Sequence, residues 1–271
     1  MRTAHHILAI STILVSLAAV PAGAQIAIDP TAASGSNLGI SVSWMHTVGN
    51  APNRLLVVGV ASATANPFPT ATSVTYGGQP LTRQVVSTQL GAPNIEIWTL
   101  VAPPNGTAQI IATFPQSTTI AGGSVSFSGV DQGTPIRATN NARALGIGVT
   151  VATSVTTNIG DVMIDAVAAA GTSASGSPAI GQTLQWSGST SGTLFGGGST
   201  KPGAAGTTIM SWNLSGGSPS VSGDIAAISL MPATVSNGPT VTPLPPTLLL
   251  VCMGLAALAV WNQRRLFRLG L

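Results

Sequence analysis

Strand patterns, separated by Gly, Pro, Asn and Ser, recur about every ten to fifteen residues through the middle of this chain. Residues 38–46 alternate between apolar and polar positions, as in a strand with one buried face. Residues 54–61 form a run that is continuously apolar after Arg54, which is typical of a central strand covered on both sides. Residues 73–76 and 79–85 flank Gly77-Gly78 and predict a hairpin. These patterns favour an all-β fold.

Further strands are predicted from the same alternation, and no segment away from the two ends combines a helical period with capping signals. A run of about ten to twelve strands without a repeat of propeller-blade length predicts a two-sheet, jelly-roll-like β-sandwich. The small-residue tracts 171–181 and 187–206 are predicted to be long loops. The additional predicted strands are 94–101, 107–114, 123–130, 149–155, 161–169, 183–186, 207–212 and 224–231.

The C-terminal end carries a three-part pattern. Pro243, Leu244, Pro245, Pro246 and Thr247 introduce an apolar segment, and Arg264, Arg265 and Arg268 follow it. Residues 244–261 would span roughly 27 Å as a helix, which is enough to cross the hydrocarbon core of a membrane. The arginines predict that the C-terminus stays on the cytoplasmic side. This pattern fits either a plain membrane anchor or a sorting signal that is later removed.

The same residues resemble the PEP-CTERM sorting domain of Gram-negative bacteria, in its VPLPA-type form. Leu244 stands where the commonest form has Glu. The resemblance covers residues 243–271 and implies recognition by an exosortase-type sorting protease, a membrane enzyme linked to exopolysaccharide production. It also implies that the protein is inserted in the inner membrane before processing and reaches the cell surface or the medium afterwards.

The N-terminal end predicts export. Arg2 precedes the apolar stretch 7–20, Pro21 ends it, and Ala22-Gly23-Ala24 supplies a signal-peptidase site before Gln25. The sequence therefore divides into a signal peptide at 1–24, a β-sandwich domain at 25–233, a linker at 234–242 and the sorting signal at 243–271.

The basic pI of the whole chain, near 10.0, arises from these two ends. Between them lie five basic and six acidic residues, which gives the predicted domain a net charge of −1. A near-neutral domain without a basic patch argues against nucleic-acid binding. The single cysteine, Cys252, lies in the apolar tail, so the predicted domain has neither a disulfide nor a thiol nucleophile.

Several separate segments of the predicted domain also resemble an uncharacterised β-sandwich module of bacterial secreted and surface proteins. The resemblance implies the fold and the exported setting, and it implies no activity. It is carried by residues 46–49, 53–60, 74–82, 96–98, 102–107, 127–132 and 199–203.

No set of residues predicts catalysis, a metal centre or a cofactor. His46 lies on the apolar face of its strand and is predicted to be a buried structural histidine. Asp161 and Asp165 are predicted to anchor loops or to pair with Arg54 or Arg143. Glu96 is predicted to form a partly buried ion pair, and we interpret the domain as non-enzymatic.

Asp131 lies in a predicted turn, where its carboxylate would accept hydrogen bonds from nearby backbone groups. Calcium binding there remains an alternative.

Two functional alternatives remain open. The first is a structural protein of the cell surface or biofilm matrix. The second is a glycan-binding module, with Trp186 and Phe195 as candidate platform residues beside the small-residue tracts. Exposure of both rings on one concave face would favour glycan binding, whereas their burial would favour the structural role. A simple membrane-tethered periplasmic domain is a third, less specific, interpretation.

Overall fold

The computed structural model describes residues 25–29, 32–63, 68–88, 93–146, 149–216 and 221–234, all within one compact unit. These residues form strands, turns and bends without a helix, which confirms the all-β prediction. Accordingly, the described part of the chain offers no helix of the length and apolarity that a membrane crossing requires. The predicted signal peptide and transmembrane segment lie outside it.

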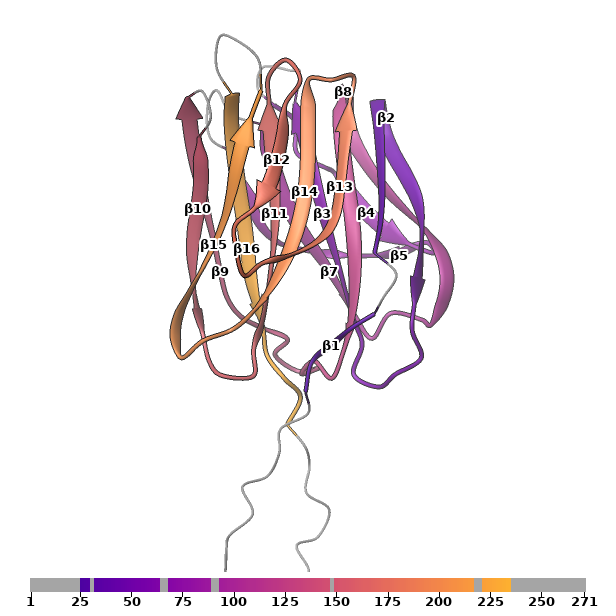
Figure 1. Ribbon diagram of the computed structural model, residues 1–271. Coiled ribbons are helices and arrows are strands. Elements are labelled where there is room, and N and C mark those ends of the chain that lie inside the picture. The colour runs from indigo at the N-terminus through magenta and orange to yellow at the C-terminus, as the bar shows by residue number, and fades with distance from the viewer. Residues whose placement is uncertain are drawn as a thin grey trace, which may run out of the picture. The chain divides into compact units, whose positions relative to one another are not determined.

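The described residues form sixteen strands in two consecutive sets (Figure 1). The N-terminal half contains β1 (Ala27–Ile28), β2 (Ala33–Val48), β3 (Leu55–Ala63), β4 (Ser73–Tyr76), β5 (Gln79–Pro80), β6 (Thr82–Ser87), β7 (Asn94–Val101) and β8 (Gly106–Ser128). The C-terminal half contains β9 (Ile136–Gly146), β10 (Thr150–Thr157), β11 (Val162–Ala170), β12 (Ser175–Pro178), β13 (Thr183–Thr190), β14 (Leu194–Pro202), β15 (Gly206–Ser215) and β16 (Val221–Leu230).

The N-terminal half is a single antiparallel sheet that folds over onto itself. The second part of β8 pairs with β3, which continues through β7 to β6. The first part of β8 pairs instead with β4 and, beyond it, β5. β2 pairs along both parts of β8, with a register shift between Gly39 and Ser41. An apolar cluster that includes Val58, Tyr76 and Trp98 fills the space between the two parts.

The C-terminal half contains two separate antiparallel sheets. One has the order β13-β14-β11-β16-β9, and the other has the order β10-β15-β12. Met163, Met210 and Trp212 belong to the apolar cluster between them.

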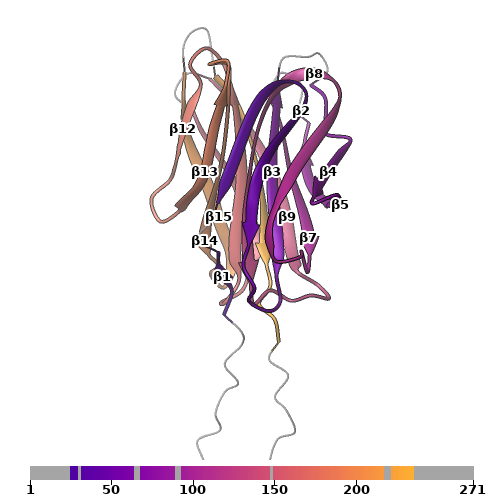
Figure 2. The ribbon, with the colours of Figure 1, turned by 90° about the vertical axis from the view of Figure 1, so that its right-hand side faces the viewer.

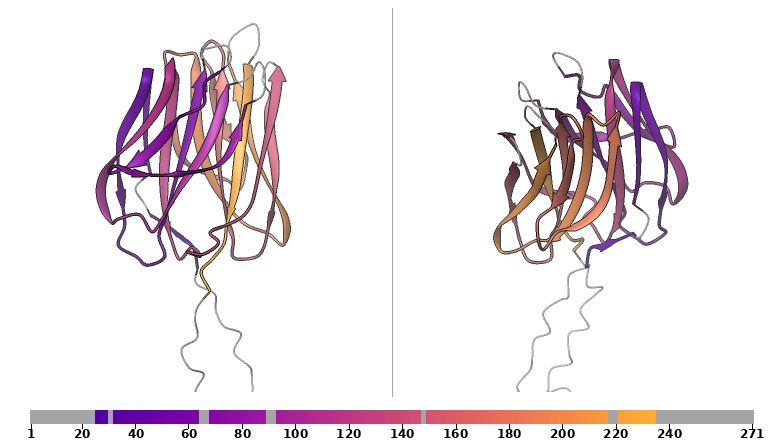
Figure 3. Two further views of the ribbon diagram at one scale, coloured as in Figure 1. Left: turned by 180° about the vertical axis from the view of Figure 1, so that it is seen from behind. Right: turned by 45° about the horizontal axis from the view of Figure 1, so that its top comes forward.

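A third apolar cluster joins the two halves, and it includes Val57 and Phe127 from one half and Ile164 and Ile228 from the other. The domain is therefore a stack of four layers, whose two halves can be distinguished in Figure 2 and in the right-hand view of Figure 3. β3 and β11 lie in the two inner layers and are buried on both faces, which explains their nearly unbroken apolar sequences. The described residues thus form three sheets where two were expected.

The two halves repeat one strand arrangement. In the inner layers, β6-β7-β3-β8-β2 corresponds to β13-β14-β11-β16-β9. In the outer layers, the pairing of β8 with β2 and β4 corresponds to the pairing of β15 with β10 and β12. The repeating unit is roughly one hundred residues, the size of a small domain. It is therefore longer than a propeller blade, and the expectation that no repeat of blade length is present still holds.

Side-chain contacts follow the same repeat. The edge strands β6 and β13 each have a register shift, between Arg83 and Val85 in one and between Leu184 and Trp186 in the other. The residue at each shift is a glutamine. Gln84 donates to the Thr99 hydroxyl at 2.8 Å, and Gln185 donates to the Thr200 hydroxyl at 2.8 Å.

Contacts between the halves are reciprocal as well. Ser34 of the first half donates to the carbonyl of Ser187, and Asn141 of the second half donates to the carbonyl of Val86. Each edge strand thus receives a side-chain hydrogen bond from β2 or β9 of the opposite half.

The two predicted glycine-rich loops are wrong, because they contain β12, the second half of β13 and all of β14. Gly123 and Gly198 lie against the indole of Trp186, and a Cβ at either position would come within about 2 Å of it. Gly197 similarly faces Trp212. The glycines make room for large rings between closely packed sheets, so a run that resembles a loop in sequence forms a central strand.

The first and last described residues leave the domain at one end, shown at the bottom of Figure 1. The Ala233 amide donates to the carbonyl of Gly129 at 2.8 Å. Gly129 also adjoins the Gln25 carbonyl so closely that a Cβ there would lie 2.5 Å from it. Both ends of the described domain therefore meet at Gly129. We call this end the terminal pole.

Candidate functional site

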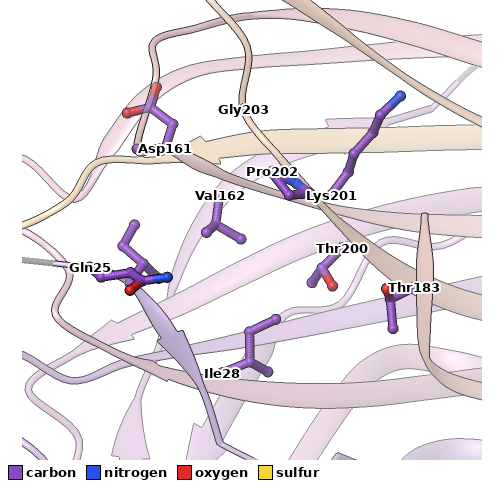
Figure 4. Close-up of a pocket in the computed structure, with 11 residues that line it drawn as sticks. Gln25, Ile28, Asp161, Val162, Thr183, Thr200, Lys201, Pro202 and Gly203 are labelled. Atoms are coloured by element: carbon purple, nitrogen blue, oxygen red, sulfur yellow. The ribbon is translucent and has the colours of Figure 1, made fainter. Parts of the chain in front are cut away.

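A pocket of about 340 Å³ opens near the terminal pole, between β1 and the ends of β11, β13 and β14 (Figure 4). Its apolar lining comes from Ile26, Ile28 and Val162, and its polar lining includes Asp161 and Lys201. The volume falls in the range of small-ligand sites. What the pocket can do depends on whether its polar groups are free to act.

Asp161 is fully engaged in holding the structure together. Arg137 donates to both carboxylate oxygens, at 2.5 and 3.0 Å, and the Asn158 amide and Ser229 hydroxyl donate as well. Burial raises the pKa of Asp161, but these hydrogen bonds, led by that from Arg137, outweigh burial and leave the pKa lowered. The carboxylate is an anchor for the turn before β11, as predicted, although its partner is Arg137 and neither Arg54 nor Arg143.

The remaining polar side chains of the pocket do not form a catalytic set. The Thr200 hydroxyl accepts a hydrogen bond from Gln185, and the Lys201 ammonium donates to the carbonyl of Ile209. Neither of these contacts joins a nucleophile to a base.

His46 belongs to a buried polar chain in the N-terminal half. Its two ring nitrogens contact the hydroxyls of Ser124 at 2.9 Å and Ser126 at 3.2 Å. Ser126 donates to the Asp29 carboxylate at 2.7 Å, and Trp44 donates to Ser124 at 2.9 Å. Burial lowers the pKa of His46 to about 4, with the charge of Asp29 opposing the shift.

This hydrogen-bonded chain of side chains differs from a hydrolytic triad in the order of its members and in its accessibility to a substrate. In a triad the carboxylate orients the histidine, whereas here Asp29 accepts from a serine. Both serines and His46 are buried, so no substrate could reach them. The prediction that His46 is a buried, hydrogen-bonded histidine is confirmed.

Asp165 is a buried residue of the C-terminal half. It accepts hydrogen bonds from the Trp212 indole at 2.9 Å, from the backbone and hydroxyl of Ser199, and from Gln182. Burial raises the pKa of Asp165 to about 7 despite these donors. Its side chain lies in the core and does not line the pocket.

Glu96 forms the expected ion pair. Arg83 approaches it at 3.3 Å and lies 5.4 Å from the centre of the Trp98 ring, while Trp98 and the Ala71 amide also donate to the carboxylate. Burial raises the pKa of Glu96, and the hydrogen bonds only partly oppose this.

Asp131 caps its own turn by accepting from the Gly133 and Thr134 amides, as predicted. Across the residues that the structure describes, no group of three or more His, Cys, Asp or Glu side chains is placed to hold a metal ion.

Trp186 and Phe195 do not form an exposed platform. Trp186 is 5 % exposed and lies between the two halves, whereas Phe195 is 7 % exposed and packs with Trp212 in the core of the C-terminal half. Their burial satisfies the criterion that favours the structural role. Trp44, Trp98 and Trp212 are also buried.

The other predicted functional residues fall outside the described part of the chain. These are Ala22 and Ala24 of the signal cleavage site and Pro243, Leu244, Pro245, Pro246, Thr247, Arg264 and Arg265 of the sorting motif. Gln25, the predicted mature N-terminus, is the first described residue and lines the pocket.

Sequence reasoning missed the polar partners Asp29, Ser124, Ser126 and Arg137. Alternation marks Ser124 and Ser126 as facing one side of a strand, but nothing local indicates that this side meets His46.

No protein-family model matches the chain, and no curated protein matches it.

Proposed function

We propose that the protein is an exported structural protein of the cell surface or biofilm matrix. Its signal peptide would direct it through the inner membrane, and an exosortase-type protease would act on residues 243–271. The observation that carries the proposal is the meeting of both domain ends at Gly129. A tail that is attached or removed at this pole would leave the strands of the domain unchanged.

The saturated polar groups of the domain support a role without catalysis. The carboxylates of Asp161, Asp165 and Glu96 each accept several hydrogen bonds within the fold. Such groups stabilise a structure and are not available to a substrate. We therefore propose that the protein is not an enzyme and uses no cofactor or metal.

A glycan-binding role for the exopolysaccharide matrix is less well supported. All described tryptophans and Tyr76 are buried, and Phe68 is partly buried against the central core. Flat exposed rings are the usual contact surface for sugar faces. A simple membrane-tethered periplasmic domain would have the same fold as the proposed surface protein and would differ from it only in keeping its C-terminal segment.

We further propose a jelly-roll-like classification for each half. Numbering the strands of the C-terminal half from one to eight gives 1-8-3-6-5 in one sheet and 2-7-4 in the other. This order supports two jelly-roll-like sandwiches packed through their larger sheets.

Replacement of the sorting prolines tests the proposed delivery. In the full chain, changing Pro243, Pro245 and Pro246 to Ala should leave the protein in the inner membrane, because the motif for the sorting protease is lost. Pro239→Ala, a proline of the adjoining linker, is the matched control and should reach the surface normally. Equal surface delivery of the triple variant and the wild type would overturn the proposal.

A further inference from the structure

The two outer layers present a pair of equivalent surfaces on opposite sides of the stack. The N face is the outward side of residues 41–48, the first part of β8 and β4, and it includes Ser43, Met45, Gln109 and Ile111. The C face is the outward side of β10, β15 and β12. It includes Thr150, Ala152, Ser154, Thr156, Ile209 and Asn213.

The strands that form both faces carry no charged residue. Residues 41–48, 106–113, β4, β10, β12 and β15 contain no Asp, Glu, Lys or Arg, and their one histidine, His46, is buried. One cation from β14 adjoins the C face, because the Lys201 ammonium donates to the carbonyl of Ile209 at 3.3 Å. Soluble sheet proteins commonly place charges on such surfaces to prevent association, so their absence from two broad faces favours contact.

Each face has an apolar centre surrounded by ordered hydroxyl and amide groups. Met45 and Ile111 are 55 % and 37 % exposed on the N face, and Ile209 is 56 % exposed on the C face. Across the strands, Thr47 bonds Thr107 at 2.7 Å and Thr150 bonds Asn213 at 2.8 Å. An apolar centre within a polar rim is the usual composition of a protein interface.

A second copy of this chain is the occupant that fits best. Between neutral faces no charge repulsion opposes contact, and the described domain carries a net charge near zero. A sugar polymer is less suitable because neither face carries an aromatic ring.

The size of the faces indicates how strong a contact would be. β15 has ten residues, and a three-strand surface of that length covers on the order of 450 Å². Stable interfaces bury about 800 Å² per partner, so one contact alone is weak. Because the two faces point in opposite directions, repeated contacts do not close into a ring of two and instead extend a linear assembly.

We propose that the N and C faces are self-association surfaces through which copies of this protein form open-ended assemblies. This inference rests on the proposed structural function and specifies how the protein would build a matrix.

Sedimentation velocity of the mature protein recovered from the cell surface or medium tests the inference. Over about 10 μM to 1 mM, the range suited to weak contacts, the average mass of the wild type should rise beyond that of a dimer. Met45→Arg and Ile209→Arg should each stop assembly at a dimer or smaller, and the double variant should remain monomeric. Ile159→Arg changes an isoleucine that is 82 % exposed outside both faces, and it should behave as the wild type.

A wild type that stays monomeric, or that stops at a closed dimer, would overturn the inference. Continued assembly of either single-face variant would do the same. Dextran, a neutral polysaccharide, serves as a second probe; binding that the double variant loses, with a monomeric wild type, would assign the faces to glycan instead. The intact mass of the same sample reports sorting separately, so failure of the proposed delivery is distinguishable from failure to assemble.

Discussion

His46 lies in the core between Ser124 and Ser126, where burial favours its neutral form and lowers its pKa to about 4. Its pKa in the unfolded chain is near 6.5, so the unfolded state binds the proton first as the pH falls. The stabilisation is therefore complete above pH 6.5 and is lost between pH 6.5 and 4, by up to about 3 kcal/mol.

Urea unfolding of the wild type and His46→Gln at pH 7.5 and 4.5 measures this effect. The difference in the free energy of unfolding between the wild type and His46→Gln should shrink at the lower pH. Only the wild type has a histidine that is neutral when buried and protonated when the chain unfolds. A free-energy difference that is the same at both pH values would contradict the lowered pKa of His46.

Gly123 shows why a particular residue is required in an inner sheet. A Cβ at this position would lie 2.0 Å from the Trp186 ring. Gly123→Ala should therefore lower the free energy of unfolding by about 3 kcal/mol or more, since a close-packed core cannot shift freely. Gly188→Ala is the control, because a Cβ added at this position would have nothing within 4 Å. It should change the free energy of unfolding by less than about 1 kcal/mol. Comparable thermal unfolding of the two variants would exclude the proposed packing role.

At the residue scale, features that depend on neighbouring residues could be predicted from sequence, whereas contacts between distant strands could not. The buried His46, the self-capped turn at Asp131 and the ion pair of Glu96 were all predicted, because each follows from a strand face or a turn. The partner of Asp161 was not, since Arg137 reaches it only after β9, β16 and β11 have paired in one sheet. The exposed role suggested for Trp186 and Phe195 failed because the neighbouring tracts form strands of a sheet that packs on both faces and are not loops.

The edge strands β6 and β13 provide a test at the scale of the element. Gln84 and Gln185 occupy equivalent bulges and make equal hydrogen bonds to Thr99 and Thr200. Replacing either glutamine by alanine should cost about 1 kcal/mol, and the double variant should lose the sum, because the sites lie in different halves. Gln79→Ala removes an exposed glutamine and should cost less than about 0.5 kcal/mol. Chemical denaturation would contradict the equivalence if only one of the two glutamines affected stability.

Strands with clear alternation or an apolar run could be predicted from sequence, as β2, β3 and β7 show. β14 could not, because Gly196, Gly197 and Gly198 resemble a loop unless the facing tryptophans are known. β9 was missed because its half-exposed polar residues give no regular alternation.

The shared core predicts how the described domain unfolds as a whole molecule. Val57 and Phe127 of one half and Ile164 and Ile228 of the other belong to a single apolar cluster, so separation of the halves would expose it even though each half also has a cluster of its own. We expect one cooperative transition, with calorimetric and van't Hoff enthalpies that agree. Two resolved calorimetric transitions would show that the halves unfold independently.

The number of layers lay beyond sequence analysis. In the N-terminal half, the long strands β2 and β8 each contribute to two layers, whereas β9, β10, β15 and β16 are separate, shorter strands. The correspondence of the halves is therefore clear only in the repeated pairings and the paired glutamines. The all-β class, by contrast, follows directly from the spacing of strand and turn residues.

The intact mass of the protein from the native cell surface or medium tests the proposed export and sorting most directly. The account predicts a chain that begins at Gln25 and has lost everything beyond the region of Pro243 to Thr247. A chain that still ends at Leu271 and remains in the inner membrane would contradict sorting and leave a tethered domain.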